Sequence, residues 1–474
     1  MTMTRDDRAG RAHASSARRA RASESRFAYN PLAGQQGNVP FLLRAAAFSI
    51  FFFPSSMVVG VIGAAGTVPL ILCCLLLAFW FASWVWNLHR PITLRHPGRL
   101  AGVMFFIAVG GSYVALYGGW IGRTTPTAQA SADRWMILVA ASLGLILAGG
   151  ETVRTMADVL QLSRWILAGA FFCSLVGFVQ FTLHLNPMEW IQTAMAGFTY
   201  NGGDTPFQQR GNLMRVAGST FHSIEFAVVS AMLLPLSIWR ALYDRKGKQA
   251  FHWLQTAFLV FAIASTVSRS GTLGAVVALA VFVPFMPRTA KRVVLIATPL
   301  VVTVLFIALP GFLGTLMSAL TADNSDPSIA TRTNNYPRVV RMVDERPWFG
   351  LGPGNYHADN ALQILDNQYL NAAVSIGLIG LAFLVVYLWL PAVSTVLAAR
   401  AARTPALRAL AGATAGGLAV AAVCSVTFDS LSFPVFALVY PLLVGLAGGV
   451  WRMVQDEPRF YGRPAPFASR TWGE

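Results

Sequence analysis

The sequence predicts an all-α polytopic membrane protein with about 12 transmembrane helices and one large non-cytoplasmic loop that contains short helices. Three observations predict this fold class: the chain is 55% hydrophobic, only 12% of its 474 residues are charged, and long apolar runs recur along it. A soluble domain usually carries about a quarter charged residues. The composition therefore excludes an ordinary soluble globule.

The apolar runs give the positions of the predicted helices. A membrane-spanning helix needs roughly 20 mainly apolar residues, and twelve such runs are present. An even number of spans places both termini on the same side of the membrane. The spans cover 41–63, 67–86, 101–121, 135–151, 164–183, 222–239, 252–268, 271–287, 292–310, 371–397, 409–427 and 431–451.

The distribution of charge predicts which side holds the termini. With the N-terminus in the cytoplasm, cytoplasmic segments hold 27 of the 36 Lys and Arg residues, and the other side holds 9 Arg together with 11 of the 20 acidic residues. Positive residues favour cytoplasmic loops. The net charge of +16 is therefore largely an orientation signal, and we expect no nucleic-acid partner.

The same topology divides the chain into three parts. Residues 1–40 are rich in Arg, Ser and Ala without an apolar period, which predicts a disordered basic cytoplasmic tail. A membrane domain follows over 41–451, and 452–474 form a second cytoplasmic tail. The substantial non-cytoplasmic segments are 184–221 and 311–370, so any chemistry is expected on that side.

No metal or cofactor is predicted. The four cysteines lie inside apolar stretches, without the spacing of metal ligands or of a disulfide framework. Three glycines, Gly350, Gly352 and Gly354, follow no predicted strand and precede no Gly-Lys-Ser/Thr motif. We therefore expect no nucleotide cradle there.

Arg215 is the first candidate binding residue. It precedes the sixth span, and an Arg near a membrane is costly unless it meets an anion, which suggests a docking point for a phosphate or a carboxylate. The alternatives are an ion pair with Glu225 or an extended side chain that reaches the interface. Glu225 itself is expected near a helix N-terminus, where the helix dipole favours a carboxylate.

Arg269 is the second candidate. It is the one charged residue between Trp253 and Pro287, and it lies among Ser265, Ser268 and Ser270 at a tight reversal between two spans. A lone arginine at the membrane edge is a functional candidate. The alternative is an interfacial anchor at a helical hairpin.

The large loop contributes the third group. Val339, Val340 and Val343 share a helical face, while Arg338 and Arg341 are neighbours, which predicts a short amphipathic helix at the membrane surface. Its basic face could contact lipid headgroups or substrate. His357 follows on the same loop.

A fourth group stands at the start of the tenth span, as Asp366, Asn367 and Tyr369. A carboxylate and amides in this position are typical of a helix N-cap, and Asp429 is expected to cap the twelfth span in the same way. Two arginines and two aspartates are nevertheless all predicted at one membrane face, which favours a shared functional site.

Four sequence motifs resemble the O-antigen ligase and polymerase superfamily of bacterial envelope enzymes, the Wzy- and WaaL-like membrane proteins. They lie in order over roughly 210–445. The matching stretches are RVAGSTFHSIEFA around Arg215, TVSRSG around Arg269, ERPWFGLGPGNY followed by DNQYLNAAVSIGLIGL, and TFDSLSFP around Asp429.

The resemblance implies transfer of a glycan from an undecaprenyl-diphosphate carrier at the periplasmic face of the bacterial inner membrane. The family's diphosphate-binding arginines correspond to Arg215 and Arg269, and its conserved aspartate corresponds to Asp429. Ligases typically have His-Asn where this chain has Asp366-Asn367, and their His is the proposed base. The difference favours a polymerase with Asp366 as base; His357, nine residues upstream, is the alternative base.

The sequence therefore predicts a polymerase of lipid-linked oligosaccharide repeat units, with Arg215, Arg269 and Asp366 as catalytic residues. Its expected partners are the lipid-linked glycan donor, a glycan acceptor, the bilayer, a chain-length regulator and a flippase. A ligase that passes finished glycan to lipid A core or protein is the first alternative, and a transporter of lipid-linked sugars is the second. The residues expected to bind substrate are Arg338, Arg341, His357, Asn367, Tyr369 and Asp429.

Overall fold

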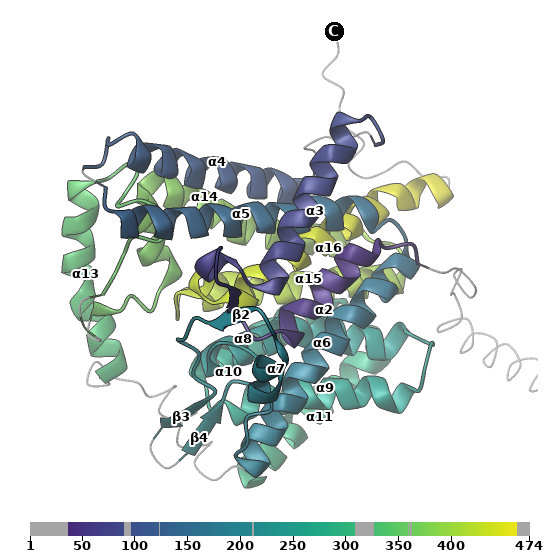
Figure 1. Cartoon of the computed structure of the whole chain (residues 1–474). Coiled ribbons are helices and arrows are strands. Elements are labelled where there is room, and N and C mark those ends of the chain that lie inside the picture. Colours follow the sequence, from purple (N-terminus) through teal and green to yellow (C-terminus); the bar gives the residue numbers. More distant parts are fainter. Residues whose placement is uncertain are drawn as a thin grey trace, which may run out of the picture.

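The protein is an α-helical bundle, which confirms the predicted fold class (Figure 1). The computed structural model describes residues 37–89, 96–122, 124–210, 213–308, 327–358, 360 and 363–461. The predicted tail therefore lies mostly outside the described residues, as do 309–326 of the large loop and the last thirteen residues of the chain.

A helix stands in each of the twelve predicted spans. Eight of these helices are long and apolar enough to cross a membrane, within the part of the chain that the structure describes. They are α3 (Val68–Val85), α4 (Pro97–Tyr117), α5 (Pro126–Thr152), α6 (Met156–Leu183), α8 (Ser223–Tyr243), α14 (Gln368–Ala401), α15 (Pro405–Cys424) and α16 (Pro434–Tyr461). The others are α2 (Phe41–Phe52), α9 (Gln249–Ser265), α10 (Arg269–Phe282) and α11 (Arg288–Ala308).

The first predicted span is too long. We expected a helix over 41–63, but α2 has only 12 residues, which is about 18 Å at 1.5 Å per residue and shorter than a hydrocarbon core of about 30 Å. Pro54 follows its end, and the chain then forms strand β1 (Met57–Val59), which pairs with β2 (Phe198–Tyr200). A proline removes a backbone donor and disfavours helix in the residue before it.

The remaining elements are short, except for one helix in the large loop. They are η1 (Gly63–Ala65), α7 (Met188–Ala194), β3 (Phe207–Arg210), β4 (Leu213–Val216), η2 (Val283–Phe285), α13 (Pro327–Glu345) and η4 (Ser430–Ser432). Strands β3 and β4 form an antiparallel pair in which Gln208 lies opposite Arg215.

The bundle has a buried centre and a lipid-facing rim. In α8, α15 and α16, 89% of the apolar stretch is buried inside the protein, against 22% in α3. Helix α16 packs on α5, and α15 packs on α8, α10 and α14. Small residues permit the close approach: a Cβ added at Gly417 would lie 2.4 Å from the Met232 carbonyl oxygen. This packing is typical of membrane helices.

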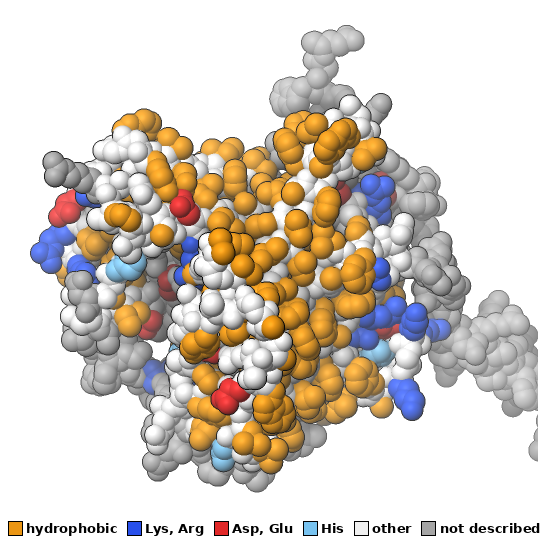
Figure 2. Space-filling view, in the orientation of Figure 1, with side chains coloured by type: hydrophobic (Ala, Val, Ile, Leu, Met, Phe, Trp, Pro, Cys, Tyr) orange, Lys and Arg blue, Asp and Glu red, His pale blue; other side chains and the backbone are white. Residues whose placement is uncertain are grey.

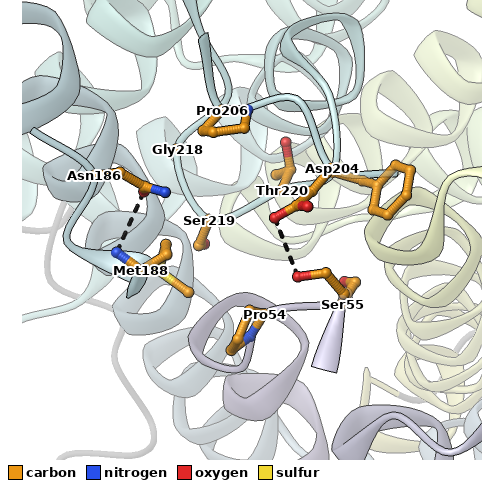
Figure 3. Close-up of a pocket in the computed structure, with 11 residues that line it drawn as sticks. Pro54, Ser55, Asn186, Met188, Asp204, Pro206, Gly218, Ser219 and Thr220 are labelled. Atoms are coloured by element: carbon orange, nitrogen blue, oxygen red, sulfur yellow. Dashed lines mark hydrogen bonds between the residues drawn. The ribbon is translucent and has the colours of Figure 1, made fainter. Parts of the chain in front are cut away.

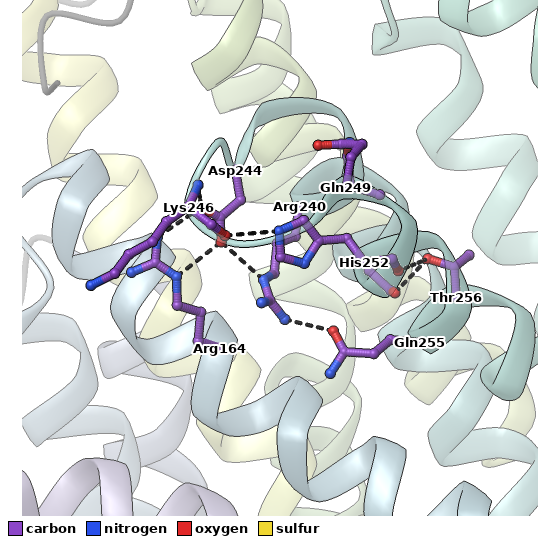
Figure 4. Close-up of polar contacts among 10 residues, drawn as sticks. Arg164, Arg240, Asp244, Lys246, Gln249, His252, Gln255 and Thr256 are labelled. Atoms are coloured by element: carbon purple, nitrogen blue, oxygen red, sulfur yellow. Dashed lines mark hydrogen bonds and ion pairs between the residues drawn. The ribbon is translucent and has the colours of Figure 1, made fainter.

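One end of the bundle holds paired charges, and we call it the basic end. Arg99 at the start of α4 pairs with Glu151 near the end of α5, and Arg164 of α6 pairs with Asp244 just after α8. Asp244 also pairs with Arg240 (Figure 4). In Figure 2, Lys and Arg side chains gather at the right edge, while hydrophobic side chains cover the middle.

The opposite end is the site end, where α8, α10, α14 and α16 begin. Here the large loop is joined to a break in α14. Gly377 has φ 71° and ψ −175°, and these backbone angles lie outside the α-helical region. Its neighbours bond to the loop instead: the Leu378 N–H donates to the Pro347 carbonyl (2.7 Å), and the Leu351 N–H donates to the Val374 carbonyl (3.0 Å). The break satisfies its backbone groups within the protein, as a membrane helix requires.

Candidate functional site

The starts of α8 and α16 meet at a single buried carboxylate. Glu225 lies in the first turn of α8 and is fully buried. Its Oε1 accepts the N–H groups of Val435 (2.6 Å) and Phe436 (2.9 Å), and its Oε2 accepts the N–H of Phe221 (2.8 Å). Glu225 is therefore a cap, as the sequence suggested, but it caps α16 as well as its own helix. The Arg215 Nε donates to the Thr266 carbonyl rather than to this carboxylate.

The starts of α10 and α14 meet the end of α15. The Gln368 N–H donates to the Ser425 carbonyl (2.9 Å), and Gln368 Oε1 accepts the Leu431 N–H (2.7 Å). The Cys424 thiol lies 3.4 Å from the Ser270 carbonyl oxygen. Four helix N-termini thus lie at the site end. Each carries partial positive charge, so this end favours anions.

Arg215 lies beside the turn that precedes Arg269. Its Nε donates to the carbonyl of Thr266 (2.7 Å), in the reversal between α9 and α10. Val267, the next residue, has φ 48°, which is strained for a β-branched side chain. Arg269 is then the first residue of α10 and is half-buried. The structure therefore brings the strand that carries Arg215 to the helix start that carries Arg269.

His222 belongs to the same group, although the sequence did not single it out as a site residue. It is the N-cap of α8: its Nδ1 accepts the Ile224 N–H (3.0 Å), and its Nε2 lies 2.7 Å from Gln208 Nε2. Burial, followed by the charge of Arg215, lowers the pKa of His222 to about 4. The ring is therefore neutral near pH 7.

Asp429 lies in the loop between α15 and α16 and does not cap the twelfth span. Its Oδ2 accepts a hydrogen bond from Asn371 Nδ2 (2.9 Å) and another from the Ser432 hydroxyl. Its Oδ1 is buried and has no hydrogen-bond partner among the described residues. The pKa of Asp429 is raised to about 6, chiefly by burial and least by the charge of Asp366.

Asp366 and Asn367 immediately precede α14 and have different roles. Asn367 is the N-cap, since its Oδ1 accepts the N–H groups of Tyr369 (2.9 Å) and Leu370 (3.3 Å). Asp366 is exposed. The Tyr369 hydroxyl donates to the Ala422 carbonyl (2.8 Å) and accepts from the Trp389 indole (3.0 Å). The cap interpretation is confirmed for Asn367, and the acidic pair is Asp366 with Asp429.

Aromatic rings connect the arginine group to the acidic pair. The His222 ring contacts Phe433, with 5.6 Å between centroids, and Phe433 contacts Phe428 at 5.4 Å. Phe428 directly precedes Asp429. The two groups therefore belong to one continuous region of the site end.

The loop residues lie on and beside α13, so the predicted helix is present but longer than expected, and its place at the membrane surface stays a prediction. Val339 is buried in a small apolar cluster with Leu365 and Val374. The Arg338 guanidinium lies 5.7 Å from the centre of the Tyr356 ring and 3.3 Å from its hydroxyl. Arg341 and His357 are exposed. These two side chains stay candidates for substrate contact.

A small hollow lies behind the Arg215 segment. Figure 3 shows it between Pro54, Asn186, Asp204 and the Gly218–Thr220 turn. Its volume is about 10 Å³, which admits about one water molecule. It therefore holds no sugar, and it fits the role of a packing defect behind the site.

A comparison with known families supports the predicted resemblance over part of the chain. A sequence-family model described as O-antigen ligase matches residues 254–385. The predicted resemblance to the O-antigen ligase superfamily is confirmed. The matched region runs from α9 into α14 and contains Arg269, Asp366 and the loop residues, whereas Arg215 and Asp429 lie outside it. No curated protein matches the chain.

The match to the O-antigen ligase model and the long apolar helices together indicate a multi-pass membrane protein. Family members are membrane glycosyltransferase-like enzymes, either ligases or polymerases. The O-antigen ligase match therefore supports a role in glycan processing at a membrane.

Proposed function

We propose that the protein polymerises oligosaccharide repeat units carried on undecaprenyl diphosphate, at the periplasmic face of the inner membrane. The observation that carries this proposal is the approach of Arg215 to the start of α10, where Arg269 stands and helix N-termini converge. Two guanidinium groups and helix dipoles form a site suited to a diphosphate.

The arginines act on the leaving group. As the bond to the anomeric carbon breaks, negative charge grows on the lipid diphosphate, and fixed positive groups stabilise it without reorganising. A single displacement inverts the anomeric configuration. The acceptor hydroxyl loses its proton in the same step, so a base is needed, and the site end offers the carboxylates of Asp366 and Asp429.

The membrane provides the rest of the site. The apolar rim of the bundle leaves the polyprenyl tail in lipid, while the large loop and α13 cover the sugars. We place both termini in the cytoplasm because 27 of the 36 Lys and Arg residues lie in the segments on that side of the predicted topology. A flippase that delivers the donor and a chain-length regulator are the expected partners.

Polymerase is preferred over ligase because Asp366-Asn367 stands where ligases have His-Asn. Deletion of the gene tests this choice. Loss of a polymerase leaves single repeat units on the cell surface, whereas loss of a ligase leaves long polymer on the carrier lipid. The second pattern would assign the protein as a ligase.

The diphosphate role is tested by complementing that deletion with Arg215→Ala or Arg215→Lys. We expect the alanine variant to restore no long polymer and the lysine variant to restore part of it, since a lysine keeps the charge but not the planar fork. Arg134→Ala, another arginine on the predicted periplasmic side, is the matched control. Normal chain length in Arg215→Ala at wild-type expression would contradict the role.

A further inference from the structure

We propose that Asp429 is the general base that removes the proton from the acceptor hydroxyl. This inference rests on the proposed glycosyl transfer and names the residue that performs its proton step. The sequence pattern favours Asp366, so the structure exchanges the roles of two neighbouring carboxylates.

Neighbouring side chains hold one oxygen of Asp429 and not the other. Asn371 and Ser432 hold Oδ2, and Asn371 is itself fixed because its Oδ1 accepts the Ser375 hydroxyl (2.8 Å). Oδ1 has no hydrogen-bond partner among the described residues, although it is buried. A buried carboxylate oxygen without a donor is costly. An acceptor hydroxyl that donates to Oδ1 would remove this cost.

The surroundings of Asp429 also adjust its proton affinity. A general base works best when its pKa lies near the working pH. Burial is the main cause that raises the pKa of Asp429 to about 6, and the charge of Asp366 makes the smallest contribution to that value. The groups that face Asp429 from α14 and η4, Asn371 and Ser432, are neutral donors that lower the pKa in part. Asp366, by contrast, is exposed to water.

The resulting step is balanced. The acceptor oxygen forms a bond to the anomeric carbon while its proton passes to Asp429 Oδ1. The bond between the anomeric carbon and the diphosphate oxygen breaks, and its electron pair leaves with the diphosphate, which faces Arg215 and Arg269. Asp429 then releases the proton to water.

The test uses the full-length protein in membranes with a lipid-diphosphate oligosaccharide donor, and it measures kcat as a function of pH. We expect Asp429→Asn to lower kcat by about 10²- to 10⁴-fold while donor binding is retained. Asp344→Asn, an exposed carboxylate of α13, is the matched control. An Asp429→Asn protein within tenfold of wild type would overturn the proposal.

The pH profile tests the same idea without altering Asp429. Because the base must be ionised, wild-type kcat should rise with pH through about 6. Asp366→Asn removes the neighbouring negative charge, so the pKa of Asp429 falls and the acidic limb moves to lower pH. A wild-type limb at about pH 4, the ordinary range of an exposed aspartate, would overturn the proposal, as would loss of the limb in Asp366→Asn, because Asp366 would then be the base.

Failure of the proposed function gives a different result. Wild-type protein would then leave the lipid-linked donor unchanged at every pH, which overturns both proposals. Failure of the base assignment alone leaves an active wild-type protein whose activity survives Asp429→Asn and is lost in Asp366→Asn or His357→Asn.

Discussion

Two carboxylates at opposite ends of the bundle are treated in opposite ways. Burial acts to raise the pKa of Asp244 at the basic end, but hydrogen bonds and charge from Arg164, Arg240 and the Lys246 amide outweigh it and leave that pKa below its ordinary value. The pKa of Asp429 at the site end is raised to about 6. At the basic end, ion pairs hold the helices together. At the site end, Asp429 Oδ1 has no hydrogen-bond partner among the described residues.

The first and largest test makes the same substitution at both ends. Asp244→Asn leaves Arg164 and Arg240 facing each other without their carboxylate, and removing one partner of a buried pair costs about 3–5 kcal/mol. We expect a large fall in thermal stability in detergent with turnover per folded molecule retained. Asp429→Asn should instead keep or raise stability and lose turnover. Equal losses of stability in Asp244→Asn and Asp429→Asn would contradict the different roles of the two carboxylates.

The pH dependence of stability has a fixed sign at the basic end. Because the pKa of Asp244 is lowered on folding, its contribution is present above its unfolded pKa of about 3.9 and is lost as the pH falls through the folded value. Asp244→Asn should therefore be less sensitive to acid than wild type.

A second test compares arginines. Arg269→Ala should lower kcat by about 10²- to 10³-fold, the usual effect of removing one group that stabilises transition-state charge, with little change in melting temperature. Arg452→Ala is its control: Arg452 donates to the Gly150 carbonyl (2.7 Å) toward the basic end, so its loss should affect stability and spare kcat. A loss of kcat in both variants would show that the ends are not separate.

A third test addresses Glu225, which stabilises the helices and also lies beside the proposed reaction site. Glu225→Gln replaces one of two acceptor oxygens with a donor, so one set of N–H groups loses its partner at a cost of about 1–3 kcal/mol. We expect a lower melting temperature and a parallel fall in kcat, since only η4 and Phe433 separate Asp429 from the start of α16. The control is Glu189→Gln, an exposed carboxylate at the same end. Unchanged stability would contradict the capping role.

The smallest effect is expected in the loop. Arg338→Ala removes a cation–π contact worth about 0.5–1 kcal/mol at an exposed site. The Michaelis constant for the donor should rise severalfold at most, with kcat unchanged. Arg341→Ala is the control, because it removes the same charge from an exposed side chain of the same helix. An effect seen only in Arg338→Ala would therefore come from the order of the loop and not from charge. A loss of kcat as large as that of Arg269→Ala would move Arg338 into the reaction site.

Hydropathy was sufficient to find the helices because a bilayer imposes length and apolar composition on each of them separately. It failed at α2, where Pro54 ends the helix early, a local signal that an apolar run conceals. The reversal between α9 and α10 was predicted correctly from the serines and Arg269, since its determinants are adjacent in sequence.

The assignment of caps could not be predicted. Asp429 stands close before α16 and reads as its cap, yet Glu225, more than 200 residues earlier, fills that role. Capping across helices depends on packing, which local spacing does not encode. For the same reason, Asp366 and Asp429 were both identified as candidates, but only their burial distinguished them.

The break in α14 has a consequence for recombining this chain with its relatives. A Cβ at Gly377 would lie 2.3 Å from the Trp348 carbonyl oxygen, and one at Gly350 would lie 2.5 Å from the Val374 carbonyl oxygen. The backbone of the loop and the backbone of the break therefore fit together only when both positions are glycine. A chimera that exchanges this loop with that of a relative should transfer 346–378 as one segment. A loop grafted onto a helix that lacks the glycine break would clash with the helix backbone.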